Sequence, residues 1–170
     1  MHLLELSDDN PVLERLLDFQ LYHVPRASGP WWVYGSIGAW EVTADTGHGC
    51  EFCVLARDDD PMLATVVCAA AYYHANPDPS FRLGLGHTVP IGAGFLGGAC
   101  DHLLVSKPYP IGPEFELCHL SDDLHVQFLW LLPITQAERR FLHEHDLEQL
   151  ERRFDDAGIA YLDPNRASVA

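Results

Sequence analysis

Residues 124–132, LHVQFLWLL, form the longest apolar run of this chain and predict its central strand. The run is rich in aromatic and branched side chains, and Pro133 follows it. We therefore expect a strand that is buried on both faces and ends at the proline. Thr135 and Glu138 then match a capping box, in which each side chain accepts a hydrogen bond from the other residue's backbone N–H. This pattern predicts that a helix begins directly after the strand.

A second helix is predicted after the first. Asp146 is a suitable residue for its N-cap, and Leu150 and Phe154 recur at the spacing of one helical face. Gly158 follows the last turn, where a residue in the left-handed conformation is expected. A short strand over 159–162 completes a strand–helix–helix–strand unit.

The rest of the chain gives shorter signals of alternating type. We expect helices over 11–21 and 62–73 and strands over 50–56, 101–106 and 115–119. The segment 31–43 predicts a strand with a bulge or turn, because it contains Gly35 and Gly38, and 83–98 predicts a Gly-rich loop with short extended pieces. Helices at the start, middle and end surround strands, and no internal repeat or linker stands out. The sequence therefore predicts an α+β fold, a single domain over 1–170 with a mixed β-sheet flanked by helices.

Charge is the strongest signal of composition. Twenty-five acidic residues stand against ten Lys and Arg, which gives a net charge of −15 with histidine neutral. This balance disfavours nucleic acid, which is bound by neutralising its phosphates, and favours a basic protein partner. The alternative is that the acidity only keeps the protein in solution.

Five aspartates at predicted turns are candidates for contact with a partner. They are Asp58, Asp59, Asp60, Asp122 and Asp123. Their alternative role is to cap helices and turns. For Asp163 and Arg166, near the C-terminus, we expect a structural ion pair or hydrogen bond instead of contact with a partner.

The sequence also bears on location. The chain has no apolar run long enough to span a membrane, and its start, with an acid at Glu5 and no basic stretch, does not resemble a signal peptide. We therefore expect a cytoplasmic protein, a monomer or weak dimer, whose odd number of cysteines is reduced.

Two motifs are candidate sites of chemistry. Cys50 and Cys53 form a C-x-x-C next to His48, but on a strand their side chains point to opposite faces, which opposes a shared zinc ion. Residues 92–97 fit G-x-G-x-x-G, but a strand is predicted to follow them where a dinucleotide site needs a helix. We assign no catalytic, metal or cofactor-binding residue.

The chain resembles the suppressor of fused (SUFU-like) domain family, most clearly over 48–170. The segments that carry the likeness are 48–52, 85–90, 102–109, 131–135 with Glu138, 158–159, 161–164 and 166–169. What the resemblance implies is protein binding. The animal member of the family sequesters a zinc-finger transcription factor of the Hedgehog pathway by clamping a peptide. Stand-alone bacterial members resemble immunity proteins that block a cognate polymorphic toxin.

Three functions follow as hypotheses. The first is a non-enzymatic immunity protein that covers a basic toxin domain. The second is a small hydrolase or metal-dependent enzyme that uses His48, Cys50, Cys53 or His87. The third is a peptide-sequestering regulator that adds a partner strand to an exposed sheet edge.

Overall fold

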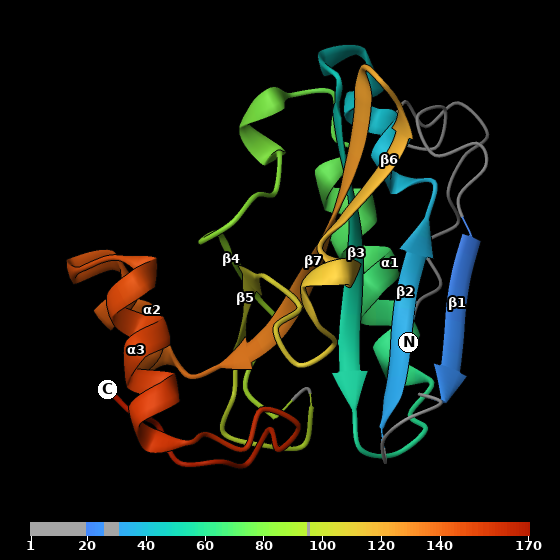
Figure 1. Ribbon diagram of the computed structural model, residues 1–170. Coiled ribbons are helices and arrows are strands. Elements are labelled where there is room, and N and C mark those ends of the chain that lie inside the picture. The colour runs from blue at the N-terminus through green and yellow to red at the C-terminus, as the bar shows by residue number, and fades with distance from the viewer. Residues whose placement is uncertain (1–19, 26–30, 95) are drawn as a thin grey trace.

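A computed structural model describes residues 20–25, 31–94 and 96–170, and these form one seven-stranded sheet with helices on both faces (Figure 1). The strands are β1 (Gln20–Pro25), β2 (Trp32–Ile37), β3 (His48–Ala56), β4 (Thr88–Pro90), β5 (His102–Ser106), β6 (Leu117–Ser121) and β7 (Leu124–Ile134). The α-helices are α1 (Met62–His74), α2 (Gln136–Glu144) and α3 (Leu147–Ala157), and three 3-10 helices are η2 (Ala39–Thr46), η3 (Pro79–Phe81) and η4 (Pro113–Phe115). No helix within the described ranges is long and apolar enough to cross a membrane.

Strand β7 is the centre of the sheet. The strand order is β1-β2-β3-β7-β5-β4, and β6 pairs with the first half of β7, on the same side as β5. The β3–β7 pair is parallel and the β5–β7 and β6–β7 pairs are antiparallel, so the predicted mixed sheet is confirmed. β7 runs through Pro133 to Ile134, and the prediction that the strand ends at the proline was wrong. Beyond Trp130, β7 no longer pairs with β3, and a strand with one unpaired side accommodates a residue that lacks an N–H.

The two faces of β7 belong to two separate cores because successive side chains point in opposite directions. Leu129 and Leu131 lie on the face that α1 covers, where they join Phe52. Trp130 and Leu132 lie on the other face, against Leu150 and Phe154 of α3. The predicted burial on both faces holds for the second half of β7, whereas most residues of its first half are partly exposed.

The helix signals of the C-terminal half are confirmed. Thr135 and Glu138 form both hydrogen bonds of the capping box at the start of α2. Asp146 caps α3 by accepting the N–H of Gln149 at 2.8 Å. Gly158 ends α3 in the left-handed conformation, with φ of 57°.

The predicted last strand over 159–162 was wrong. This segment forms turns, and the N–H of Asp163 donates to the carbonyl of Ala160 at 2.9 Å. Its apolar side chains pack against the core beneath α3. The apolar character of this run therefore reflects packing against a neighbouring surface and does not reflect pairing within the sheet.

Two predictions nearer the N-terminus also need correction. Gln20 and Leu21 lie in β1, so the helix expected over 11–21 does not extend to its predicted end, and residues 11–19 lie outside the described part of the chain. The segment 31–43 does contain the expected turn, at Gly38 with φ of 104°, but the strand ends before it at Ile37 and η2 follows in place of further strand. The buried carboxylate of Glu51 accepts the N–H groups of Gly38 and Trp40, which fixes the start of η2.

Candidate partner-binding surface

Strand β6 is exposed along its whole length. All five of its residues are exposed, and the side chains of Leu117 and Leu120 are 47% and 50% accessible. Among the described residues β6 pairs only with β7, so its other edge offers unpaired backbone groups. Sequence reasoning predicted a strand here but missed its exposure, because leucine in a short strand is typical of a core.

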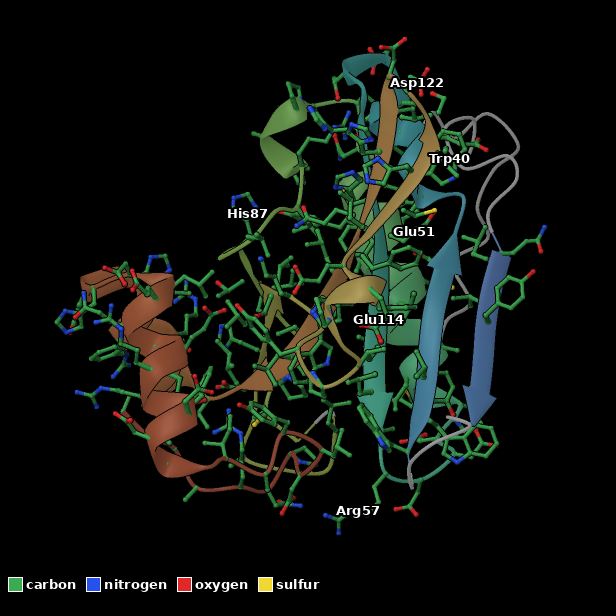
Figure 2. The ribbon with its side chains drawn as sticks, viewed as in Figure 1. Trp40, Glu51, Arg57, His87, Glu114 and Asp122 are labelled. Carbon is green, nitrogen blue, oxygen red and sulfur yellow. The ribbon has the colours of Figure 1, made fainter. Side chains whose placement is uncertain are left out.

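The turn between β6 and β7 carries two of the predicted aspartates. Asp122 and Asp123 are both exposed, and Figure 2 shows Asp122 at the far end of the hairpin. The backbone of Gly47 lies against this turn: its carbonyl accepts the N–H of His125 at 3.1 Å. Asp45, two residues earlier, is also exposed. This end of the sheet is therefore acidic; we call Asp45, Asp122 and Asp123 the acidic tip.

A row of three histidines crosses the sheet beside the acidic tip. His48 of β3 and His119 of β6 are both paired in register with His125 of β7. The ring centroids lie 6.1 Å apart for His48 and His125 and 4.5 Å apart for His119 and His125. Within the described ranges, no group of three His, Cys, Asp or Glu side chains is arranged to hold a metal ion. The row instead places three titratable imidazoles close to the acidic tip.

The other three predicted aspartates lie at the opposite end of the sheet, directly after β3. The nine residues of β3, at about 3.3 Å each, separate the two groups by roughly 30 Å. Asp59 accepts a hydrogen bond from the hydroxyl of Tyr34, and burial together with this contact raises the pKa of Tyr34 to about 12. Asp60 accepts the N–H of Met62 at 3.0 Å, at the start of α1. Two of the three therefore have structural partners.

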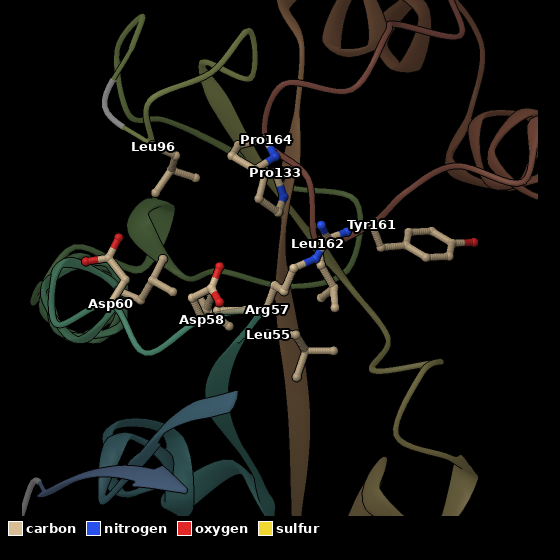
Figure 3. Close-up of a pocket in the computed structure, with 12 residues that line it drawn as sticks. Leu55, Arg57, Asp58, Asp60, Leu96, Pro133, Tyr161, Leu162 and Pro164 are labelled. Atoms are coloured by element: carbon tan, nitrogen blue, oxygen red, sulfur yellow. The ribbon is translucent and has the colours of Figure 1, made fainter. Parts of the chain in front are cut away.

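Asp58 and Asp60 also line a cavity of about 140 Å³, which Figure 3 shows in close-up. Its other walls include Leu96, Pro133 and Leu162. Arg57 lines it as well, so a positive charge accompanies the two carboxylates. This end of the sheet is for these reasons a weaker candidate for binding a basic partner than the acidic tip.

The residues of the enzyme hypothesis do not form one site. Cys50 and Cys53 belong to the cores on opposite faces of the sheet, and burial raises the pKa of each thiol to about 12. Cys50 lies 3.7 Å from Nε2 of His74, whose Nδ1 accepts the N–H of Leu83. His87 is exposed and lies apart from β3 (Figure 2). A thiol with such a pKa stays protonated at neutral pH and is a poor nucleophile.

The Gly-rich motif lies in the loop before β5. Gly92, Gly94 and Gly97 all have positive φ, and β5 follows them. A dinucleotide fold needs a helix at this point, whose N-terminus would face the phosphates. The three glycines allow the loop to turn, because glycine adopts positive φ without strain.

Arg166 has a structural role, as predicted: its backbone N–H donates to the carbonyl of Asp163 at 3.1 Å, but the partner of its guanidinium is Glu138 and not the carboxylate of Asp163. Its guanidinium forms two hydrogen bonds with the carboxylate, at 2.5 and 2.8 Å, and both side chains are almost fully buried. Asp163 instead accepts the N–H of Asn165 at 2.9 Å. The pair fastens the C-terminal segment to α2 and leaves Arg166 inaccessible to a partner.

Comparisons with known proteins agree with this fold. The family model for Suppressor of fused protein (SUFU) matches residues 18–167. The crystal structure of a SUFU homolog from Neisseria gonorrhoeae FA 1090 is 36% identical, with a TM-score of 0.75, and the match covers 96% of this chain and 85% of that one. No curated protein shows a significant match to this sequence.

Two more distant structures share the fold. Drosophila Suppressor of Fused is 15% identical with a TM-score of 0.64, over 89% of this chain and 42% of that chain. The Sufu–Fu complex gives 15% identity and a TM-score of 0.63, over 89% of this chain and 76% of that chain. The family model and the Neisseria homolog each match most of the sequence, and the chain belongs to the Suppressor of fused protein (SUFU) family.

Proposed function

We propose that this protein is a non-enzymatic, cytoplasmic binding module that acts as an immunity protein and blocks a cognate toxin. The observation that carries the proposal is the hairpin of β6 and β7, which joins an exposed edge strand to the acidic tip. Family membership supports it, because the Sufu–Fu structure is a complex between two proteins. The net charge of −15 supports a basic toxin domain as the partner.

The hairpin offers two kinds of interaction. The free edge of β6 accepts a strand of the partner through backbone hydrogen bonds, and alternate side chains then give specificity. Leu117 and Leu120 are both exposed, and a β-bulge leaves Leu120 without a partner residue on β7, so the strand offers two apolar side chains to a partner. The acidic tip raises the rate of association with a basic surface.

The test is co-expression with the toxin gene next to this gene, read as rescue of growth and as a complex in size-exclusion chromatography. The double variant Leu117→Lys with Leu120→Lys should lose both rescue and complex. Leu85→Lys is the matched control, because Leu85 is 40% exposed but lies outside the hairpin. Thermal unfolding of both variants shows whether the fold is intact. Absence of rescue by the wild-type chain refutes the immunity role.

The free edge of β6 also favours the second candidate, a regulator that sequesters a peptide. The two functions differ in the size of the bound partner. Limited proteolysis of the complex distinguishes them, since a peptide regulator retains a short protected segment, whereas an immunity protein needs a folded toxin domain.

A further inference from the structure

A second cavity, of about 220 Å³, lies on the face of the sheet that α3 covers. Strands β5 and β7 contribute Ser106 and Trp130 to its lining, and these two residues are paired in register. Tyr109 also lines it, together with Tyr161, whose ring points away from the first cavity in Figure 3. None of these side chains belongs to the β6 edge or to the acidic tip, so the cavity is separate from the surface of the proposed function.

Every charged side chain among the described residues of this lining is a carboxylate. The two are Glu151 and Asp155, which lie four positions apart on α3 and therefore on one face of the helix. Lys107 and Arg152, which directly follow two residues of the lining, each form an ion pair with a glutamate outside it. The lining therefore brings two negative charges together without supplying a cation for them.

The hydroxyl groups of the lining donate their hydrogen bonds to these two carboxylates. Glu151 accepts one hydrogen bond from Ser106, at 3.1 Å, and another from Tyr109. Asp155 accepts one from Tyr161 at 3.4 Å. Burial, and then the charge of Glu151, raises the pKa of Tyr109 to about 12, so this phenol remains a donor at neutral pH. The carboxylates are thus held in place and keep capacity to accept further hydrogen bonds.

These contacts restrict the kind of ligand that the cavity accepts. The three hydroxyl groups are already used as donors, and the indole N–H of Trp130 is buried, so the polar side chains of the lining offer a ligand acceptors and no free donor. A matching ligand brings donors, no acceptor of its own, and a positive charge. Guanidinium and ammonium groups have this character, whereas amides and carboxylates do not.

We propose that the cavity is a binding site for a guanidinium group. The N–H groups of a guanidinium form a rigid fork that donates to Glu151 and Asp155 together, which the compact ammonium matches less well. The tyrosine rings favour the same group, because a guanidinium stacks on aromatic faces. It is also more weakly hydrated than an ammonium, so it leaves water more easily.

The test compares three capped amino acids of similar length. Nα-acetyl-arginine methylamide carries the guanidinium, its citrulline counterpart carries a neutral urea of nearly the same shape, and its lysine counterpart carries an ammonium. Binding is followed by NMR through the backbone amide signals of Glu151 and Asp155. The arginine derivative should shift these signals in a saturable manner, the lysine derivative should bind at least threefold more weakly, and the citrulline derivative at least tenfold more weakly. Absence of saturable binding by the arginine derivative, or equally tight binding by either of the others, overturns the proposal.

Variants of α3 test the two carboxylates directly. Glu151→Gln with Asp155→Asn should weaken binding of the arginine derivative at least tenfold, because both charges of the lining are lost. Glu148→Gln with Asp156→Asn is the matched control: it removes the same charge from the same helix, at two exposed residues outside the lining, and should bind like the wild type. Thermal unfolding shows whether both variants are folded.

Asp155→Asn alone keeps the test decisive if the double variant unfolds, since Asp155 is exposed and its replacement is tolerated by the fold. This single variant should weaken binding of the arginine derivative at least threefold. Undiminished binding to a folded variant of the lining refutes the site.

A fourth probe, methylguanidinium, distinguishes the two sources of a guanidinium. If it binds as tightly as the arginine derivative, the natural ligand is a free guanidine compound. If it binds several-fold more weakly and the arginine derivative still depends on Glu151 and Asp155, the ligand is an arginine side chain of another protein. Both results support the guanidinium site. None of these measurements needs a toxin, so failure here is distinct from failure of the immunity role.

Discussion

Glu51 shows how one buried carboxyl determines the path of the backbone. Burial raises its pKa above the ordinary value of 4.5, and hydrogen bonds from Ser36, Gly38 and Trp40 lower it in part. Its hydrogen bonds replace those that the first N–H groups of η2 lack. Backbone N–H dipoles thus stabilise the negative charge of the Glu51 carboxylate, whereas its loss of contact with water destabilises that charge.

The raised pKa predicts a pH dependence of stability with a definite sign. The folded state binds the proton of Glu51 more tightly than the unfolded state does, so the stability contributed is fully present below about pH 4.5 and is lost as pH rises through the folded pKa. Glu51→Gln removes this titration. We expect the free energy of unfolding of the wild type, minus that of the variant, to be larger at pH 5 than at pH 7.5 in urea titrations. A difference that stays constant or falls toward low pH contradicts this assignment.

The buried ion pair of Arg166 with Glu138 predicts that a single substitution lowers the free energy of unfolding strongly. Arg166→Ala leaves the buried carboxylate of Glu138 without its cation, which destabilises a protein by about 3–5 kcal/mol. The measurement is the free energy of unfolding in urea. Arg152→Ala is the control, because Arg152 pairs with Glu148 in an exposed pair on α3 and its loss costs about 0.5 kcal/mol or less. Similar losses for the two variants contradict the structural role of Arg166.

At the scale of elements, the N-cap of α3 predicts a second pH effect, opposite in sign to that of Glu51. Hydrogen bonds from Gln149 lower the pKa of Asp146 below 3.8. This stability is present above about pH 3.8 and is lost as pH falls through the lower folded value. Asp146→Ala should lower Tm at pH 7, and the gap from the wild type should narrow toward pH 3. Asp146→Asn, which caps without titrating, should keep a Tm near that of the wild type at pH 7; a gap that is independent of pH refutes the carboxylate's role.

The elements that sequence predicted best are those with local causes. The capping box of Thr135 and the left-handed Gly158 depend on residues within one turn, and both are as predicted. Two of the errors concern pairing between residues that are far apart in the sequence. Nothing near 159–162 reveals that no strand lies beside it, and nothing near Leu21 reveals that β2 pairs with this residue. The local pattern of residues indicates whether a segment is helix or strand, but it does not show which other segments pack or pair with it.

The candidate site shows the same division. Sequence identified acidic residues at turns, but it could not show that Asp122 and Asp58 lie at opposite ends of β3 or that Asp59 and Asp60 are engaged in the fold. It also missed the row of histidines, because His119 comes close to His48 only through their shared pairing with His125. Residues far apart in the sequence come into contact through the register of the sheet, which the sequence alone does not show.

At the scale of the whole molecule, the charge distribution predicts how binding depends on pH. If all ten histidines gain a proton, the net charge moves from −15 to −5. Three of the ten form the row beside the acidic tip, so any charge placed on them lies next to the proposed surface. Imidazole ordinarily gains its proton near pH 6.5. We therefore expect affinity for a basic partner to fall between about pH 7.5 and pH 5.5.

The measurement is the dissociation constant of the complex across this range at fixed ionic strength, with the association rate recorded in parallel. Steering by charge acts mainly on association, so most of the loss should appear in that rate and should shrink in high salt. Asp122→Asn with Asp123→Asn removes charge from the acidic tip, and this variant should bind more slowly at pH 7.5 and show a weaker pH dependence. Asp58→Asn, at the other end of β3, is the control and should behave like the wild type. Affinity that is flat from pH 7.5 to pH 5.5 would show that the acidic tip does not steer the partner. Binding would then depend on the β6 edge and its two leucines alone.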